Sequence, residues 1–481
     1  MDRPEIHHLT EIVLIDGRER PLTLTSDGRF LWPEGGQRSF SVEREVLGFA
    51  ADGPRKVKVR VLLEEGGGFC VGAGNVGSGK LVRRELVFEA LTEESSRAWC
   101  SKLEEYIGYL GRPKRLCVLL NPFGGKKIAP RIFANDVRPL LVDAGIDIDV
   151  KETQYQSHAK EIAHSLDLST YDGIVCVSGD GILVEVINGL LEREDWESAI
   201  RMPIGVVPAG TGNGMAKSLL DAVGQPCSPS HATLAIIQGN KQSLDVATIV
   251  QQDKKFFSVL MLAWGLVADI DIESEKYRWM GSARIDFYAI QRILHLRRYT
   301  GRISFVPAPG YESYGVSLSS INTYKYPVIA QVKGYRGPDV SLEESSWRTI
   351  EGPFVSIWLH NVPWGAEKTM AAPKAQFSDG YLDLIAIRDC PKLALLSLMT
   401  ELSNGGHVKS PHVTYLKVKA FVLEPGPRAG DPKKKEGIID ADGEVLARGA
   451  GTYKCEQASL MSYDRLQITV HQGLATVFCP K

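Results

Sequence analysis

Three short apolar runs in one part of this chain each end in a glycine-containing turn, and each turn is followed by a helical pattern. The runs cover residues 116–120, 174–177 and 204–207, and a further apolar run covers 146–150. Strand-like runs that alternate with helical segments are typical of a parallel sheet with helices on both faces. Because parallel strands end at one edge of such a sheet, we expect the three turns to lie together where ligands bind.

The three turns contain residue types that can hold phosphate groups. Their sequences are Asn121-Pro122-Phe123-Gly124-Gly125, Ser178-Gly179-Asp180-Gly181 and Pro208-Ala209-Gly210-Thr211-Gly212-Asn213. Glycine lets a ligand approach the backbone closely, and a helix N-terminus attracts anions. The hydroxyls of Ser178 and Thr211 can donate hydrogen bonds to phosphate oxygens. One such turn alone is typical of any strand-to-helix connection, but three in one sheet favour a nucleotide site and a phosphotransferase.

Two carboxylates follow the second apolar run, and each allows two interpretations. Asp180 either caps the helix that we expect to begin at Gly181, or it orients and deprotonates an acceptor hydroxyl. Glu185, one turn further along the same helix, either contributes to the site or forms a surface salt bridge. Asp180 is therefore the candidate catalytic base.

The rest of the chain predicts two further units, so that the expected fold is α/β plus all-β. Residues 1–112 form a small β-rich domain closed by a helix over 92–110 that carries Trp99. This architecture resembles a pleckstrin-homology domain. The alternative is a small barrel that acts only as an interaction surface. Residues 113–240 form the nucleotide-binding α/β lobe with its parallel sheet. Residues 241–481 form an antiparallel β-sandwich lobe for lipid, with strands that include 326–332, helices around 282–296 and 392–402, and a solvated loop over 425–435.

Two matches to nucleotide motifs in the first unit are rejected. Residues 72–77 match the dinucleotide fingerprint, and residues 74–80 match most of a P-loop. Position 81 is Leu81, where a P-loop needs Ser or Thr to bind magnesium, and a strand-like pattern continues from it instead of a helix. We interpret this segment as a hairpin loop.

Composition excludes several classes of function. The net charge of −2 over 481 residues gives no indication of a nucleic-acid partner. The eight cysteines are scattered without metal-ligand spacing, which favours reduced thiols. No signal peptide or membrane-spanning run is present. We therefore expect a cytoplasmic protein that associates peripherally with membranes if its substrate is a lipid.

Taken together, the three turns and Glu185 resemble the catalytic domain of the diacylglycerol-kinase-type lipid kinases. Within that group, Ser178 at the start of the Gly-Asp-Gly turn is similar to the sphingosine kinases. The resemblance implies that ATP with Mg²⁺ is the phosphate donor and that Asp180 is the catalytic base. It also implies that Ser178, Gly179 and Gly181 contact the lipid substrate.

The block at residues 263–278, Ala-Trp-Gly-Leu-Val-Ala-Asp-Ile-Asp-Ile-Glu-Ser-Glu-Lys-Tyr-Arg, is similar to sphingosine kinases throughout. The resemblance makes Asp271 the carboxylate that recognises the polar head of the lipid. A carboxylate would favour a sphingoid base, which carries an ammonium, over neutral diacylglycerol. Arg278 and Arg284 would then reach the nucleotide phosphates. Without the resemblance, the acidic residues of this block would be better interpreted as a solvated end of a strand.

Two further segments match the family. Thr153-Gln154-Tyr155-Gln156-Ser157 corresponds to a nucleotide-contacting loop, and Asp442-Gly443-Glu444 corresponds to a C-terminal motif that returns to the phosphates and the cation. On sequence alone the second segment is only a hairpin turn. Residues 377–383 also resemble a family signature. Two positions depart from the family: Phe123 stands where many relatives carry Arg or Lys, and Gly214 stands where Ala or Asp is common.

The resemblance predicts an ATP-dependent kinase that phosphorylates the primary hydroxyl of a sphingoid long-chain base. A ceramide or diacylglycerol kinase is the alternative, and a soluble enzyme similar to NAD kinase or an inactive membrane-recruitment protein ranks lower. The N-terminal extension is similar to those of plant-type sphingosine kinases and ceramide kinases. The expected partners are the lipid and a transient membrane surface, no nucleic acid is expected, and a homodimer is left open.

Overall fold

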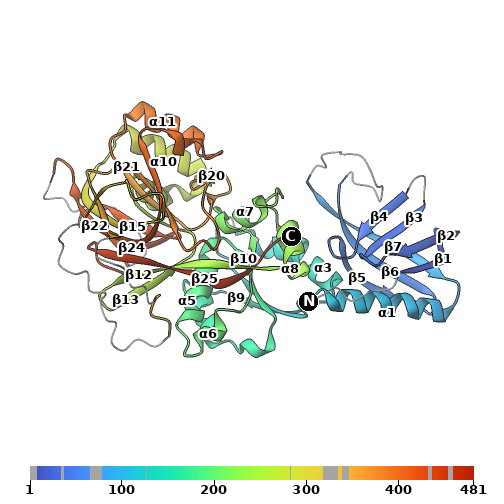
Figure 1. The fold of residues 1–481 in the computed structure, drawn as a ribbon. Coiled ribbons are helices and arrows are strands. Elements are labelled where there is room, and N and C mark those ends of the chain that lie inside the picture. Colours follow the sequence, from blue (N-terminus) through green and yellow to red (C-terminus); the bar gives the residue numbers. More distant parts are fainter. Residues whose placement is uncertain are drawn as a thin grey trace.

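The computed structural model describes residues 8–33, 37–65, 79–125, 127–281, 283–317, 334–338, 346–431, 436–452 and 459–481. Figure 1 shows a small N-terminal domain beside a larger unit of two lobes. The strand expected at 326–332 and the P-loop-like segment up to residue 78 lie outside the described residues.

The N-terminal domain is an antiparallel sheet closed by one helix, as expected. Its strands lie in the order β4-β3-β2-β1-β7-β6-β5. The helix α1 begins after Thr92, whose side chain accepts a hydrogen bond from the Ser95 amide, and it buries Trp99 against the sheet. The elements are β1 Leu9–Ile15, β2 Arg18–Leu24, β3 Arg29–Pro33, β4 Gln37–Ser41, β5 Val46–Ala51, β6 Lys56–Glu64, β7 Leu81–Ala90 and α1 Glu93–Tyr109. Strand β7 confirms that no helix follows Lys80.

The α/β lobe contains the predicted parallel strands β8, β9, β10 and β11. Its elements are β8 Arg115–Leu120, α2 Ala129–Ile132, the π-helical turn η1 Phe133–Val137, α3 Arg138–Asp143, β9 Asp147–Glu152, α4 His158–Ser165, η2 Leu168–Thr170, β10 Gly173–Ser178, α5 Asp180–Leu191, α6 Trp196–Ala199, β11 Ile204–Pro208, α7 Gly214–Asp221 and α8 Pro229–Gln238. The strands are buried throughout β10 and β11, as parallel strands covered on both faces should be.

The second lobe is mainly antiparallel, and α9, α10 and α11 cover one side of it (Figure 1). Its elements are β12 Lys241–Gln251, β13 Lys254–Ser258, β14 Met261–Gly265, α9 Leu266–Glu273, η3 Ser274–Met280, α10 Ala283–Leu294, β15 Tyr299–Pro307, β16 Val316–Ser317, β17 Arg348–Glu351, β18 Ser356–His360, β19 Trp364–Ala366, β20 Thr369–Met370, β21 Leu382–Ile387, α11 Lys392–Glu401, η5 Gly406–Lys409, β22 Val413–Arg428, β23 Ile438–Ala441, β24 Glu444–Arg448 and β25 Leu466–Phe478. One expectation is wrong: residues 425–428 are not a loop, because β22 continues through them and pairs with β15.

The two lobes share one continuous sheet. Strand β25 pairs with β22 and β12 in the sandwich lobe and then reaches β11 of the α/β lobe, where Ile204 lies opposite Val477. Strand β25 therefore contributes to the nucleotide lobe as well, although the predicted domain boundary at residue 240 places it in the sandwich lobe alone. The resulting strand order is β24-β23-β14-β18-β21-β22-β25-β11-β10-β8-β9.

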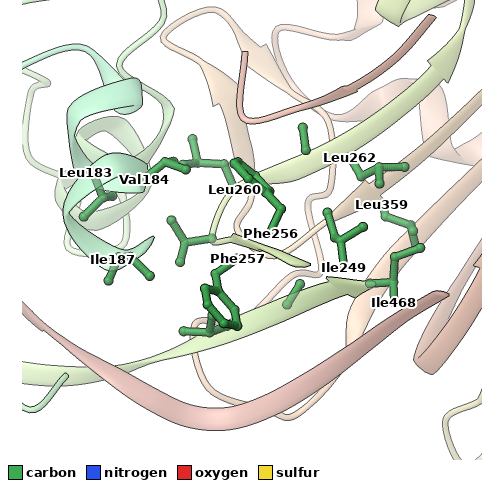
Figure 2. Packing of buried hydrophobic residues seen from close by; sticks show 14 of the residues in the cluster. Leu183, Val184, Ile187, Ile249, Phe256, Phe257, Leu260, Leu262, Leu359 and Ile468 are labelled. Atoms are coloured by element: carbon green, nitrogen blue, oxygen red, sulfur yellow. The ribbon is translucent and has the colours of Figure 1, made fainter. Parts of the chain in front are cut away.

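Helix α5 is fixed between the lobes by apolar packing and by one buried amide. Figure 2 shows Leu183, Val184 and Ile187 of α5 facing Phe256 and Phe257 of β13. Asn188 donates from Nδ2 to the Phe257 carbonyl (2.7 Å) and accepts from the Phe257 amide at Oδ1 (3.0 Å). Because α5 begins at Asp180, this packing also fixes the position of the candidate base.

The N-terminal domain attaches to the α/β lobe through the linker residue Arg112 and through Asp143. The buried guanidinium of Arg112 donates to the carbonyls of Val42, Val46 and Leu47, and Arg83 pairs with Asp143 at 2.5 Å. Burial lowers the pKa of Arg112 to about 10. These contacts join the domain to the face of the lobe that carries α3.

Candidate active site

The three glycine turns meet at the carboxyl edge of the parallel sheet, as predicted. Strand β10 lies between β8 and β11, so that the turns after the three strands are neighbours. A Cβ atom on Gly210 would lie 2.3 Å from the Cα of Gly179, and one on Gly125 would lie 3.0 Å from the Thr211 hydroxyl. Side chains at these positions would force the turns apart, so the glycines allow the backbone itself to form this surface.

Asparagine side chains hold two of the turns in shape. The Asn121 carbonyl oxygen accepts from the amides of Phe123 and Gly124, each at 3.0 Å. In the third turn the Gly210 amide donates to Asn213 at 2.9 Å, and Asn213 has a φ of 57°. Lys127 and Ser157 near the same edge also have positive φ angles, a strain that proteins often retain at functional sites.

Asp180 is the first residue of α5, and its carboxylate accepts from the amides of Gly214 (2.8 Å) and Met215 (3.0 Å). It therefore caps α7 and not its own helix, which corrects one of its two interpretations. Each carboxylate oxygen keeps a lone pair for an acceptor hydroxyl. Burial raises the pKa of Asp180, although the two amides lower it, and a raised pKa makes the carboxylate a stronger base.

Glu185 does not form the surface salt bridge that was one of its alternatives. Its two oxygens accept from the amides of Ser157 and Ala159, both at 3.0 Å, at the start of α4. Ser157 has a φ of 68° and its own side chain gives no cap, so Glu185 supplies the cap from α5. Burial raises its pKa.

The predicted nucleotide loop, which begins at the buried Thr153, leads into α4. The Gln154 amide donates to His158 Nδ1 at 3.1 Å, and the half-exposed Tyr155 ring stacks on His158 with centroids 4.6 Å apart. Gln156 donates from Nε2 to Glu444 at 2.8 Å. The last contact crosses between the lobes, and it places the hairpin of β23 and β24 beside the loop that precedes α4.

Asp442 and Glu444 of this hairpin have different surroundings. The Asp442 carboxylate is occupied by four donors, which are the Ser258 hydroxyl and the amides of Val259, Leu260 and Met261, at 2.7–3.0 Å. It thus fixes the tight turn, in which Gly443 has a φ of 83°. Its contact with the phosphates, which the resemblance implied, stays a prediction. Glu444 lies near Glu185 of the α/β lobe, and burial together with the charge of Glu185 raises the pKa of Glu444 to about 7.

The acidic block after β14 is not a solvated strand end, because it forms α9 and is largely buried. Asp269 accepts from Arg292 (3.1 Å) and Tyr299 (2.6 Å), and Glu273 accepts from Arg297 (2.9 Å). These pairs are structural. They leave Asp271 as the carboxylate of α9 without such a partner among the described residues.

Asp271 lies beside Arg284. The Arg284 guanidinium donates to Ser274 Oγ at 2.8 Å and approaches the Asp271 carbonyl at 3.5 Å. Burial raises the pKa of Asp271, and the charge of Arg284 opposes that effect. Arg284 therefore lies beside Asp271, and its contact with the nucleotide phosphates stays a prediction. The side chain of Arg278 lies outside the described residues.

Sequence analysis missed the hairpin of β19 and β20, which covers the third turn. Asn213 donates to Glu367 Oε1 at 2.6 Å, and the Glu367 amide donates to the Gly212 carbonyl at 2.8 Å. A Cβ on Gly214 would lie 2.6 Å from the Trp364 carbonyl oxygen. This close approach explains the family departure at Gly214, which was the only signal of the hairpin.

Comparisons with known proteins agree with this geometry. The family described as "Diacylglycerol kinase catalytic domain" matches residues 115–249, and "YegS C-terminal NAD kinase beta sandwich-like domain" matches residues 317–461. A solved structure titled as a putative diacylglycerol kinase from Bacillus anthracis has the same fold, with a TM-score of 0.50 at 18% identity over 77% of this chain and 96% of that one. The expected fold class is confirmed.

Curated relatives cover nearly the whole chain. Sphingosine kinase 1 and sphingosine kinase 2 of Arabidopsis thaliana are each 60% identical over 98% of this chain, and cover 96% and 97% of their own lengths. Sphingosine kinase 1 of Homo sapiens is 35% identical over 71% of this chain and 89% of its own length. With its three glycine turns, Asp180 beside them and these relatives, the chain belongs to the sphingosine kinase family of diacylglycerol-kinase-type lipid kinases.

Proposed function

We propose that this protein transfers the γ-phosphate of ATP, bound with Mg²⁺, to the primary hydroxyl of a sphingoid long-chain base. The observation that carries the proposal is the meeting of three glycine turns beside the partly buried Asp180 in the α/β lobe, with Asp271 supplied by the sandwich lobe. We call the surfaces that the two lobes contribute the α/β wall and the sandwich wall. The first wall suits a phosphate donor, and a carboxylate suits an ammonium head group. The relatives named sphingosine kinases support the same assignment.

Asp180 would act as the general base. Its carboxylate takes the proton of the primary hydroxyl, the hydroxyl oxygen forms a bond to the γ-phosphorus, and the bond to the β–γ bridging oxygen breaks to release ADP. The positive end of the α5 dipole, at the second glycine turn, would stabilise the transferred charge. Because the Gly214 and Met215 amides hold Asp180, its position does not depend on the substrate.

Mg²⁺ would enter with ATP and neutralise phosphate charge. No group of three metal-binding side chains occurs within the described ranges, so the protein would add few ligands of its own. Glu444 fits this part, because Gln156 bonds to only one of its oxygens and the charge of Glu185 raises its pKa. A cation beside Glu444 would relieve that repulsion.

Asp271 would distinguish sphingoid bases from the alternative substrates. A sphingoid base carries an ammonium that can pair with the carboxylate, whereas ceramide has a neutral amide and diacylglycerol has no nitrogen at all. Burying an unpaired carboxylate against a neutral head group is unfavourable, so the site should reject both. Burial raises the pKa of Asp271, and the charge of Arg284 opposes that rise.

Contact with a membrane, and hence peripheral association of a cytoplasmic enzyme, is proposed for the surface of η3, α10 and α11. Five apolar side chains are exposed there: Trp279, Phe287, Ile290, Leu294 and Leu393. Trp279 and Leu393 are each more than 80% exposed, which is unusual for large apolar residues. No helix in the described part of the chain is long and apolar enough to span a bilayer. A homodimer stays a prediction.

The test is a parallel assay with labelled ATP and sphingosine, ceramide, diacylglycerol and NAD, with vesicle flotation alongside. We expect phosphorylation of sphingosine above the others; a preference for another acceptor would reject the proposal. For the membrane surface, a double Trp279→Ser, Leu393→Ser variant should bind vesicles less. Val316→Ser, which changes an exposed apolar residue on β16, is the matched control and should bind as the wild type does.

A further inference from the structure

The hairpin of β19 and β20 belongs to the sandwich lobe, but it is bonded to α7 of the α/β lobe through Trp364. The Trp364 indole donates from Nε1 to Asp221 at 3.0 Å, and the Trp364 amide donates to Ser218 Oγ at 3.1 Å. On the second strand of the hairpin, the Met370 amide donates to the Leu402 carbonyl at 2.7 Å. The turn between the two strands is therefore held from both ends.

Glu367 lies in this turn and makes two contacts with the third glycine turn of the α/β lobe. Its amide donates to the Gly212 carbonyl at 2.8 Å, and its Oε1 accepts from Asn213 Nδ2 at 2.6 Å. The second contact is a charge-assisted hydrogen bond, which is stronger than a bond between neutral groups. Asn213 is 4% exposed and has a φ of 57°, a conformation that a residue other than glycine keeps only with support from its surroundings. Glu367 supplies part of that support from the other lobe.

Asn213 passes this restraint on to the backbone of the third turn. Its Oδ1 accepts from the Gly210 amide at 2.9 Å, and its Nδ2 donates to the Gly210 carbonyl at 3.2 Å. Because a carboxylate only accepts hydrogen bonds, Glu367 must face Nδ2, which leaves Oδ1 for the Gly210 amide. Within the described ranges, the amides of Thr211 and Gly212 donate to no protein group. These two amides stay available for phosphate oxygens, and Glu367 restrains the turn that carries them.

Glu367 also brings a negative charge to the surroundings of Asp180. A Cβ atom on Gly212 would lie 3.4 Å from Asp180 Oδ2 and 3.9 Å from the Gly365 carbonyl oxygen, so the hairpin lies close to this carboxylate. Burial raises the pKa of Asp180, and the charge of Glu367 raises it further. A stronger base takes the proton of an acceptor hydroxyl more readily.

The remaining charged or titratable groups near the base are an ion pair, a lysine and a thiol. Lys217 and Asp221 of α7 pair with each other at 2.6 Å, so their charges largely cancel. Lys368 follows in the hairpin turn and is exposed to solvent. Burial, and then the charge of Glu367, raises the pKa of the Cys227 thiol to about 12, so the thiol stays neutral. Glu367 is thus the group whose charge raises the pKa of the base.

We propose that Glu367 is a positioning residue for phosphoryl transfer, which holds the third glycine turn in its phosphate-binding conformation and supplies a negative charge that favours proton transfer to Asp180. It acts through Asn213 and Asp180 and does not itself contact a substrate. The proposal rests on the proposed function. The sandwich lobe thereby contributes to the phosphate side of the site as well as to the lipid side.

Two variants separate the hydrogen bond from the charge. Glu367→Gln removes the charge, but its amide oxygen can still accept from Asn213, whereas Glu367→Ala removes both. We expect KM for ATP to rise by about 10-fold in Glu367→Ala, because a charge-assisted bond that supports the turn is lost, and to stay within about twofold in Glu367→Gln. Both variants should keep the Tm of the wild type, because Glu367 lies in an exposed turn.

The charge is tested by the dependence of kcat on pH. Without the charge of Glu367 the base loses its proton at lower pH, so the acidic limb of the profile should move to lower pH in both variants. The plateau value of kcat should fall by up to about fivefold, because a charge on an exposed residue acts weakly. Both effects should shrink at 0.5 M salt, which screens the charge.

A double variant tests the route through Asn213. If Glu367 acts through this residue, Glu367→Ala combined with Asn213→Ala should raise KM for ATP no further than Asn213→Ala alone. Glu351→Gln is the matched control, since it changes an exposed carboxylate of the same lobe on β17, which pairs with β15 and β16. It should leave KM and the pH profile unchanged.

An unchanged KM for ATP in Glu367→Ala, or an acidic limb that stays in place in Glu367→Gln, overturns the assignment. Calorimetric titration with a non-hydrolysable nucleotide measures the same loss of affinity without a lipid acceptor. If the wild type phosphorylates no sphingoid base, the proposed function fails, whereas the titration still tests Glu367, so the two failures are distinguishable.

Discussion

The α/β lobe and the sandwich lobe contribute different kinds of group to the candidate site. The α/β wall is mostly backbone: glycines so close that a single Cβ would collide, with their turns held by Asn121 and Asn213. The sandwich wall is made of buried carboxyl side chains on α9, β23 and the turn after it. Backbone amides suit an anionic phosphate donor that many proteins bind. Side chains allow the sandwich lobe to discriminate among lipid head groups.

Asp180 lies on the α/β wall, but it would act through its side chain and not through its backbone. Replacing it therefore gives the largest expected effect. Asp180→Asn should lower kcat by about 10³-fold or more, because the base is lost. ATP affinity should stay within about threefold, since the amides of the glycine turns remain. Single-turnover kinetics and nucleotide titration measure the two effects. The Asn side chain can still accept a hydrogen bond from one of the two α7 amides, so the free energy of unfolding should fall by only about 1 kcal/mol. If the variant retains turnover, Asp180 is not the base.

Gly210→Ala tests whether the α/β wall depends on backbone contact. The new Cβ would lie 2.3 Å from the Gly179 Cα, so the two turns must separate. We expect ATP binding to weaken by about 100-fold, a loss typical of a few displaced hydrogen bonds. Calorimetry with a non-hydrolysable nucleotide measures it. Gly108→Ala in α1 is the control, because nothing lies within 4 Å of its added Cβ; equal behaviour of the two variants would mean that the turns tolerate separation.

Glu444→Gln tests the carboxylate wall through pH. The folded pKa of Glu444, about 7, exceeds its ordinary 4.5, so the folded protein binds more protons between these values than the unfolded chain does. The free energy of unfolding should therefore fall as pH rises from about 4.5 to 7, and this part of the fall, at most about 3 kcal/mol, should vanish in the variant. Urea unfolding at several pH values measures the difference between the two proteins. Parallel curves would contradict the raised pKa.

Phe123→Lys gives the smallest expected effect and tests whether the α/β wall lacks a charged side chain. Phe123 is 63% exposed at the first turn, where a lysine could approach the phosphates. KM for ATP should fall by about two- to threefold at low salt and return toward the wild-type value at 0.5 M salt, because exposed charges are screened. An unchanged KM at low salt would place position 123 away from the phosphates.

The α/β wall was largely predictable from the sequence, because strand, turn and helix there follow one another locally. The three turns, the cap of α1 at Thr92 and the parallel sheet were all expected and are present. The cap that Asp180 gives to α7 was not, since its donors are 34 and 35 residues away. Local pattern identifies such a carboxylate but not its partner.

The sandwich wall was less predictable, because the role of each of its carboxylates depends on contacts with residues far away in the sequence. Asp442 meets donors more than 180 residues earlier in the chain, which gives it a structural role that the sequence resemblance could not show. The surroundings of Asp440 are set by its strand pairing and by a β-bulge. Neither feature can be recognised from the periodicity of the sequence. The roles of Asp269 and Asp271, two positions apart on α9, likewise depend on which arginine each one meets.

Strand β25 adds a consequence for the order in which the protein can mature. It follows every other described element in the chain, and yet it pairs with the start of β11, the strand that leads into the third glycine turn. While the chain is being synthesised, the α/β lobe emerges first but lacks its neighbouring strand until residues 466–478 have followed. The nascent chain therefore exposes an open sheet edge along β11 and cannot hold a finished site. Catalytic competence should arise only after synthesis of the sandwich lobe is complete.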